Sequence, residues 1–344
     1  MAQLERHRRR GALSVRSRRV TTVGLIGAGT IAHEHLPGWL ALGYDVIVHS
    51  IDDQAPVITS RYGGRAVDSL DELIADVDIV DVATPTDTHR AMVERAAAAG
   101  KHVVCEKPLA ISVADAGAAI AACDAAGVRL FPAHVVRYFP AYAAMRAAVA
   151  GGRLGTPAVQ RFFRIGSAPQ RRWFREPARS GGIAMDQMIH DLDLARWTAG
   201  DVATVYATRV GDDAGDGPTT VQAVLRHRSG TISHVHGVWG AATLGFHTGF
   251  SVAGPGGLLE HDSLRHPVLQ FDGIVADDGD DGYLPPVDAA TSPYTAELAD
   301  FARAIRDGDD ARVTARDGLE AVRIAAAVNR SLDEGRAIPL EDVR

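Results

Sequence analysis

Apolar residues along this chain gather in short runs, and longer segments with helical spacing separate them. The runs lie at about 20–26, 45–50, 78–82, 101–105 and 128–131. Near-continuous apolar runs of this length are typical of strands buried on both faces of a parallel sheet. Helices are expected between them at about 30–42, 54–62, 70–74, 88–99 and 113–126, with a short strand at 65–67. This alternation predicts a right-handed, doubly wound α/β sheet.

The pattern changes beyond His134. Residues 137–150 are expected to form a connecting helix, and residues 185–198 a second helix. Segments that alternate like half-exposed strands lie at 158–165, 202–210, 219–226, 231–239, 247–253 and 268–274. Two final helices, at about 293–306 and 315–332, have an apolar stripe that predicts packing against the body. This part therefore predicts an α+β domain with an open, mostly antiparallel sheet.

The first predicted strand ends at a glycine turn, Gly27-Ala28-Gly29, in a Gly-x-Gly-x-x-Ala pattern. Such a turn lets the backbone approach a pyrophosphate, and the N–H groups of Thr30 and Ile31 at the following helix start point at that anion. A tight turn without a ligand is the plainer interpretation. The strand before the turn and the helix after it favour a dinucleotide site, because that context is what the motif requires.

Other polar residues follow the later strands. In doubly wound sheets, ligands bind at the carboxyl ends of the strands, so these residues are expected to line one crevice with the glycine turn. They are Ser50, Thr84, Pro85, Glu106 and Lys107.

Ser50 stands where an acid commonly binds the adenosine ribose 2′-hydroxyl of NAD. A serine hydroxyl can bond a 2′-phosphate without repelling it, so the sequence favours NADP over NAD. Asp52 and Asp53 follow closely enough to reverse that preference if the strand ends elsewhere.

Length and charge divide the chain further. A chain of 344 residues predicts two domains, here 21–135 and 136–344, after a basic segment 1–20. That segment holds seven arginines and one glutamate in its first nineteen residues, which predicts a disordered tail. The net charge of −7 leaves the body acidic once the basic tail is set aside. An acidic body disfavours nucleic acid as a partner, so an incidental extension is the preferred interpretation of the tail.

Several classes of protein are disfavoured by what the sequence lacks. It has no long apolar span and no signal peptide, so membrane insertion and export are not expected. Cys105 and Cys123 are too few for a disulfide framework, which fits a reducing, cytoplasmic location. No metal is expected: His234 and His236 share a strand face without acidic or cysteine partners. The acidic segments 212–216 and 277–281 lack the ligand spacing of an EF-hand and are expected to be solvated loops.

Three motifs in order resemble one family. Gly27-x-Gly29-x-x-Ala32, then Glu106-Lys107-Pro108, then Gly181-Gly182 followed by 186–193 are together similar to the glucose-fructose oxidoreductase/inositol dehydrogenase/rhizopine catabolism family, usually called Gfo/Idh/MocA. The resemblance covers nearly all of the chain after residue 20. It implies a Rossmann domain, an open-sheet second domain that forms a homodimer or homotetramer, and NAD(P)-dependent hydride transfer on a sugar, inositol or related polyol.

The resemblance also implies roles in the reaction. His190 is the base for the hydroxyl proton, Asp186 supports it or holds substrate, and Lys107 holds the reacting hydroxyl. Oxidation of a secondary alcohol needs such groups. Asp186 and His190 are four apart on the predicted helix, so the carboxylate is expected to orient the imidazole and stabilise its cation. A surface lysine and a satisfied core histidine are the plainer alternatives.

Further positions are weaker candidates. His89 matches a family position near the cofactor, although a histidine at a helix start is nearly as plausible. Arg137, Trp173 and Arg164 are expected to reach the substrate pocket, with packing or surface positions as the alternative. Asp193, three residues after His190, suits a local structural hydrogen bond equally well.

The sequence departs from the family pattern at two positions. Met188 replaces a common glycine and is expected to narrow or reshape the pocket, and Ser50 replaces a frequent acid. Two other functions stay open: a non-catalytic NADP-binding regulator, and a redox-neutral sugar-modifying enzyme with tightly bound NAD. Retention of Lys107 and His190 argues against the regulator.

Overall fold

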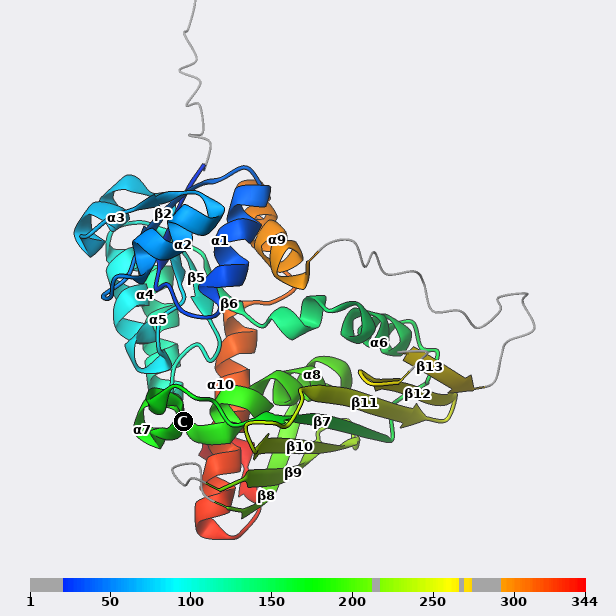
Figure 1. The fold of residues 1–344 in the computed structure, drawn as a ribbon. Helices are drawn as coiled ribbons and strands as arrows, with labels where there is room; N and C mark the ends of the chain where they lie inside the picture. Colours follow the sequence, from blue (N-terminus) through cyan, green and yellow to red (C-terminus); the bar gives the residue numbers. More distant parts are fainter. Residues whose placement is uncertain (1–20, 212–216, 266–268, 274–291) are drawn as a thin grey trace, which may run out of the picture.

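The computed structural model describes residues 21–211, 217–265, 269–273 and 292–344, and it contains two sheets (Figure 1). The first has six parallel strands in the order β3-β2-β1-β4-β5-β6. This is the doubly wound order, so the predicted α/β architecture is confirmed. Its elements are β1 (Thr22–Ile26), α1 (Ala32–Ala41), β2 (Asp45–His49), α2 (Gln54–Tyr62), β3 (Arg65–Ala66), α3 (Leu70–Asp76), β4 (Ile79–Val82), α4 (His89–Ala98), β5 (His102–Glu106), α5 (Val113–Ala126) and β6 (Leu130–Ala133).

The second sheet has eight strands in the order β13-β12-β11-β7-β10-β9-β8-β14. Strands β7 and β10 are parallel, and the other neighbours are antiparallel, as expected for a mostly antiparallel sheet. The elements of this half are α6 (Pro140–Ala150), β7 (Val159–Ser167), α7 (Pro177–Ser180), α8 (Ile189–Ala199), β8 (Val202–Val210), β9 (Thr219–His227), β10 (Ile232–Gly240), β11 (His247–Gly254), β12 (Gly257–Asp262), β13 (Leu269–Gly273), α9 (Pro293–Asp307), α10 (Ala315–Glu334) and β14 (Ile338–Pro339).

Local signals in the sequence explain where several helices begin and end. The Ser112 hydroxyl accepts a hydrogen bond from the Asp115 amide and caps α5, which ends at Gly127 with a φ of 67°. Thr314 and Asp317 form a capping box at the start of α10. These contacts satisfy amide and carbonyl groups that have no partner within the helix.

Four elements differ from the sequence-based expectation. The helix expected at 185–198 is divided into a π-helical turn, Ala184–Met188, and α8. The helix expected from residue 137 begins at Pro140, after a 3₁₀ turn over Val135–Tyr138. Strands β12 and β14 were not predicted. The basic tail 1–20 and the acidic segments 212–216 and 277–281 lie outside the described residues.

The last two helices join the halves of the molecule. Helix α9 lies beside α1 in Figure 1, and its Leu298 and Phe301 are buried in one core cluster with Trp39. Helix α10 contacts α5 and β6 of the first half and α8 and β8 of the second. Both predicted C-terminal helices therefore pack as core elements.

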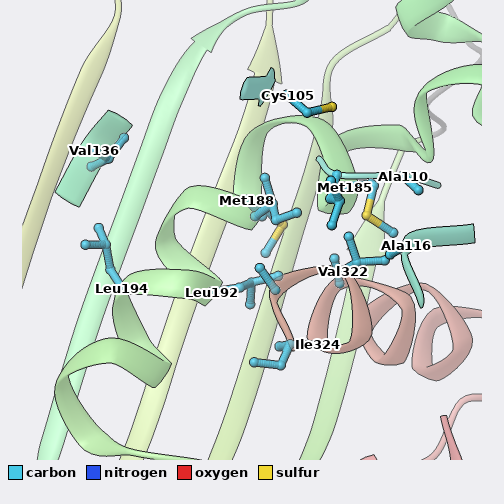
Figure 2. Close-up of a cluster of buried hydrophobic side chains, with 14 of the residues drawn as sticks. Cys105, Ala110, Ala116, Val136, Met185, Met188, Leu192, Leu194, Val322 and Ile324 are labelled. Atoms are coloured by element: carbon cyan, nitrogen blue, oxygen red, sulfur yellow. The ribbon is translucent and has the colours of Figure 1, made fainter. Parts of the chain in front are cut away.

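Met188 belongs to the hydrophobic core rather than to a pocket. Figure 2 shows it among buried side chains that include Met185 and Leu192, and it has no exposed surface. It faces Gly237 on β10, where an added Cβ would lie 2.5 Å from the Met188 side chain. The expectation that Met188 narrows the substrate pocket is therefore wrong, because its side chain points into the space that Gly237 leaves open.

Candidate active site

The polar residues predicted to share a crevice do follow or end strands at one edge of the parallel sheet. Gly27 follows β1, Ser50 follows β2, Thr84 lies just beyond β4, and Glu106 and Lys107 stand at the end of β5. The carboxyl ends of parallel strands meet at one edge, so these residues lie along the same side of the molecule.

Position 27 requires glycine because of its backbone conformation and because the Ala83 carbonyl lies close to it. Its φ is +101°, and an added Cβ would lie 2.5 Å from the carbonyl oxygen of Ala83. Its amide donates to the His49 carbonyl at 2.8 Å. A side chain here would separate β1 from β4, so the tight turn depends on glycine.

The turn after Gly27 fits the pyrophosphate of a dinucleotide. The amides of Thr30 and Ile31 donate to no other group within the described residues, and they stand at the start of α1. The guanidinium of Arg171, from the second half of the chain, lies 3.1 Å from where a Cβ of Gly29 would stand. Free amides, a helix N-terminus and a nearby cation are the groups that bind a dianion. The sequence analysis missed Arg171, although the pair Arg171-Arg172 beside Trp173 is a visible cluster.

Ser50 lies directly after β2, where the sequence placed it. Its hydroxyl donates to the carboxylate of Asp52 at 2.6 Å. Asp52 is exposed and also accepts the amide of Gln54 at 3.2 Å. The acid that could reverse the cofactor preference is therefore in contact with the serine.

His89 braces two strand ends. It is 1% exposed, and its ring nitrogens lie 2.8 Å from the Pro108 carbonyl and 2.9 Å from the Thr84 carbonyl. Burial lowers the pKa of His89, against the effect of the two carbonyl contacts. His89 thus holds the segment after β4 against the segment after β5.

Lys107 and Asp186 are brought together from the two halves of the chain. The Lys107 ammonium donates to the Asp186 backbone carbonyl at 2.6 Å and to its carboxylate at 3.2 Å. Both side chains are partly exposed, at 18% and 17%. An ion pair with that much access to solvent can still meet a substrate hydroxyl.

His190, at the start of α8, does not pair with Asp186 as the sequence predicted. Its side chain is partly exposed, while its Nδ1 atom is buried without a hydrogen-bond partner in the described structure. Burial is the largest cause that holds the pKa of His190 well below its ordinary value. The charges of Lys107 and Arg164 lower the same pKa further. His190 is therefore a neutral imidazole at pH 7, and the expected stabilisation of its cation by Asp186 is replaced by an Asp186–Lys107 pair.

The other substrate candidates differ in exposure. Arg137 is 1% exposed and forms two hydrogen bonds with Asp193, at 2.6 and 2.7 Å. It also contacts Asp317 at 3.2 Å, so the structure places it in a buried ion network rather than at the open crevice. The Asp193 carboxylate is part of this buried ion network.

Arg164 lies closer to the reacting groups, and Trp173 lies closer to the surface. Arg164 is 6% exposed, binds the Asp191 carboxylate at 2.9 and 3.1 Å, and acts electrostatically on His190. Trp173 is partly exposed in the Arg172–Arg175 turn and stacks on Phe174 with ring centroids 3.7 Å apart.

A buried cluster under the strand ends escaped the sequence analysis. The His35 ring lies 2.9 Å from Asp81 and 3.3 Å from Glu106, and Trp39 donates to Asp81 at 2.7 Å. The second Glu106 oxygen accepts the Lys107 amide at 2.9 Å. Asp81 and Glu106 raise the pKa of His35 well above its ordinary value, against the lowering effect of burial. The available signal was Asp81 itself, a charged residue inside an apolar strand.

Other possible sites find little support. In the described ranges, no three His, Cys, Asp or Glu side chains are grouped so as to hold a metal ion. His236 is hydrogen-bonded to Thr220 at 3.0 Å, and its neighbour His234 is exposed. Among the helices that the structure describes, none has the length and apolar character needed to cross a membrane.

Comparison with known proteins identifies the family. Residues 21–134 match the model described as "Oxidoreductase family, NAD-binding Rossmann fold", and residues 142–260 match the "GFO/IDH/MocA C-terminal domain". The chain belongs to the Gfo/Idh/MocA oxidoreductase family. The resemblance found from the three motifs is confirmed, and so is the assignment of the protein as a nicotinamide-dependent oxidoreductase; the preference for NADP stays a prediction.

Relatives within the Gfo/Idh/MocA family match along their whole length. The chain is 34% identical to 1,5-anhydro-D-fructose reductase of Ensifer adhaerens, covering 92% of this chain and 98% of that protein. It is 31% identical to inositol 2-dehydrogenase of Rhizobium meliloti (strain 1021), again covering 92% and 98%. Among solved structures, the WlbA dehydrogenase of Bordetella pertussis in complex with NADH and UDP-GlcNAcA is similar at a TM-score of 0.83, with 25% identity, over 94% of this chain and 98% of that chain.

Proposed function

We propose that this protein transfers a hydride between a nicotinamide cofactor and a secondary alcohol or ketone of a sugar, inositol or related polyol. The observation that carries the proposal is the contact between Lys107 and Asp186 beside a neutral His190. These residues come from the two halves of the chain and lie beyond the strand ends that fit a dinucleotide. The relatives' names, which refer to inositol and anhydrofructose, support a polyol or cyclic sugar as substrate.

His190 is proposed as the base in the oxidative direction. Because its pKa lies well below the ordinary value, the ring is neutral at pH 7 and can accept the hydroxyl proton. The accepting atom is Nε2, because Nδ1 is buried. Lys107 is proposed to donate to the same hydroxyl oxygen and stabilise its developing negative charge. Asp186 orients the Lys107 ammonium through the bonds that already join them.

The dinucleotide is proposed to lie along the strand ends. Gly27, Gly29, Thr30 and Ile31 would hold its pyrophosphate, and Arg171 would add a positive charge there. The bound nicotinamide supplies the site that accepts the hydride. Thr84, Pro85 and Glu106 would flank it. His89 would hold the two segments behind them through its contacts with the Thr84 and Pro108 carbonyls.

The choice between NAD and NADP is proposed to depend on Ser50 and Asp52. The serine alone favoured NADP, but its hydroxyl donates to Asp52 and so presents lone pairs to a ligand. Lone pairs accept a ribose hydroxyl, whereas the adjacent carboxylate repels a 2′-phosphate. These two effects, with the NADH bound to a structural neighbour, support NAD as the preferred cofactor.

The first experiment measures the absorbance of the reduced nicotinamide with NAD or NADP against a panel of inositols, aldoses and sugar acids. We expect turnover with at least one substrate and a higher kcat/KM with NAD. Lys107→Ala and His190→Ala should each lower kcat by about 10²- to 10⁴-fold, while cofactor binding measured by fluorescence is retained.

Lys101→Ala is the matched control. Lys101 precedes β5 and Lys107 follows it, and these are the only two lysines of the chain. Lys101 donates to the Val77 carbonyl at 2.8 Å, at the opposite edge of the sheet, so its removal should leave turnover unchanged. Full activity in Lys107→Ala or His190→Ala would refute the assigned roles. Cofactor binding without turnover in either direction would favour the non-catalytic regulator. Cofactor that stays bound through gel filtration would favour the redox-neutral enzyme.

Helices α8 and α10 contact the second sheet, and the face opposite them has no helix partner in the described structure. This open face supports a homodimer or homotetramer as the working form. The cytoplasmic location that the cysteine content suggested stays a prediction.

A further inference from the structure

The buried side of His190 lacks a partner that its proposed role requires. A histidine that accepts a proton at Nε2 carries its own proton at Nδ1, and a buried N–H group needs an acceptor. No side chain or backbone group within the described residues accepts from His190 Nδ1. Asp186, the acceptor that the sequence suggested, is engaged by Lys107.

A second histidine lies on this side. His134 follows β6 and is 1% exposed, and neither of its ring nitrogens has a hydrogen-bond partner in the described structure. Its Nδ1 lies 3.8 Å from the carboxylate of Asp193. Asp193 comes three residues after His190 on α8, so the two side chains leave the helix on the same face. His134 is also near enough that a positive charge on its ring would lower the pKa of His190, so only a neutral His134 can support the His190 imidazolium.

We propose that His134 is the positioning residue for His190: through one buried water it accepts the hydrogen bond of His190 Nδ1, and it is itself oriented by Asp193. This inference rests on the proposed function of His190 as the base.

The tautomers of His134 and His190 follow from the acceptor that each ring faces in the series Asp193, His134, His190. Asp193 is an acceptor, so the His134 nitrogen that faces it, Nδ1, carries the proton. His134 Nε2 is then an acceptor, and it is free to accept the hydrogen bond that the water relays from His190 Nδ1. When the substrate hydroxyl gives its proton to His190 Nε2, the imidazolium keeps both of its protons and His134 stays neutral. Within this chain of groups only the substrate proton moves, and the hydride from the same carbinol would pass to the bound nicotinamide, so the step is balanced.

The charged groups around His190 explain why an acceptor for its Nδ1 proton matters. Lys107 and Arg164 face His190 and oppose a positive charge on its ring. His134 faces Asp193, Arg137, Asp317 and Glu106, and burial lowers its own pKa, so it stays neutral. A neutral acceptor at Nδ1 therefore favours the imidazolium form of His190 without adding a charge.

The first test is a measurement on the unaltered protein. In ¹⁵N-histidine NMR spectra of the unliganded protein, with His190 assigned by comparison with His190→Ala, we expect the neutral ring of His190 to carry its proton on Nδ1. The Nε2–H tautomer would overturn the proposal. This result does not depend on activity, so it separates failure of the positioning role from failure of the proposed function, which full activity in His190→Ala would show.

The second test compares His134→Leu with His134→Gln. Loss of a group that orients a functional histidine typically costs 10- to 100-fold, so we expect His134→Leu to lower kcat by about that factor. KM and the cofactor dissociation constant should stay unchanged, and the acidic limb of the kcat–pH profile should move to lower pH, because the imidazolium loses its acceptor. His134→Gln, whose amide oxygen can accept the same proton, should recover most of the kcat.

Unchanged kcat and an unchanged acidic limb in folded His134→Leu would overturn the proposal. So would an equal loss of kcat in His134→Gln, since that result assigns His134 to packing. If His134→Leu does not fold, as judged by its thermal unfolding, the tautomer of the unaltered protein and the His134→Gln profile decide the question.

Discussion

Glu297 on α9 is a fully buried carboxyl group whose two oxygens have no hydrogen-bond partner in the described ranges. It lies near the His35–Asp81–Glu106 cluster. Burial is the largest cause that raises the pKa of Glu297 well above its ordinary value, and the charge of Glu106 raises it further. The structure therefore favours the protonated acid at this position.

A raised pKa in the folded state links stability to pH. The folded protein binds the Glu297 proton more tightly than the unfolded chain does, where the pKa is about 4.3. The stabilisation from this proton is thus complete below about pH 4.3 and is lost as pH rises through the folded pKa. Glu297→Gln keeps a neutral side chain of the same size at every pH. We expect the melting temperature of this variant to exceed that of the unaltered protein increasingly between pH 5 and pH 8.

Glu341→Gln is the control, because Glu341 is exposed. Its melting temperature should follow that of the unaltered protein at each pH. A difference between Glu297→Gln and the unaltered protein that does not change with pH would contradict the prediction.

At the scale of single residues, the sequence identified the functional residues more reliably than the residues with which they pair. Lys107 and Asp186 lie together, but Asp186 binds Lys107 rather than His190. Arg137 was expected in the pocket, yet Asp193, 56 residues away in the sequence, holds it in the interior. An ionic side chain goes to the opposite charge that tertiary packing brings near, and one sequence does not reveal that neighbour.

Elements were predicted best where a periodic pattern was long and had clear end signals. Helix α5 and strand β8 have the predicted bounds, 113–126 and 202–210. Strand β12 was missed because Gly257–Asp262 directly follows the turn at Pro255-Gly256, and β14 because it has two residues. The parallel pairing of β7 with β10 depends on strand order, which hydrophobic spacing does not encode.

The contact between the π-helical turn and β10 makes a testable pair. Gly237 leaves room for Met188, and an added Cβ would lie 2.5 Å from the methionine Cγ. Overpacking a buried contact costs about 1–3 kcal/mol, so we expect Gly237→Ala to lower the free energy of unfolding by that amount. Met188→Ala alone should lower it by about 2–5 kcal/mol, because it leaves a cavity.

In the double variant, the alanine at 237 meets a shortened side chain at 188. The loss of stability in denaturant unfolding should therefore be smaller than the sum of the two single losses. Gly117→Ala on α5 is the control: an added Cβ there meets nothing within 4 Å, so stability should stay equal or rise by about 1 kcal/mol. Simple additivity at 188 and 237 would show that these positions do not compete for space.

At the scale of the whole molecule, one face of the second sheet lacks a helix partner in the described structure. Helices α8 and α10 pack on the other face (Figure 1), against residues such as Val205 and Leu225. On the open face, Tyr206 pairs across the strands with Val224, and these side chains are 42% and 36% exposed. Ile232, at 43%, lies on the neighbouring strand β10. An extended face with exposed apolar side chains is typical of a protein interface.

We therefore predict that two or four copies of the 36.4 kDa chain associate through this face. A stable interface buries about 800 Å² on each partner, and a charge near its centre loses its hydration without gaining a partner. Light scattering after gel filtration should give a multiple of the chain mass for the unaltered protein and the mass of one chain for Val224→Asp. Val57→Asp carries the same change at a 58% exposed position on α2, and it should keep the unaltered mass. A monomeric unaltered protein, or a Val224→Asp variant of unchanged mass, would exclude this face as the interface.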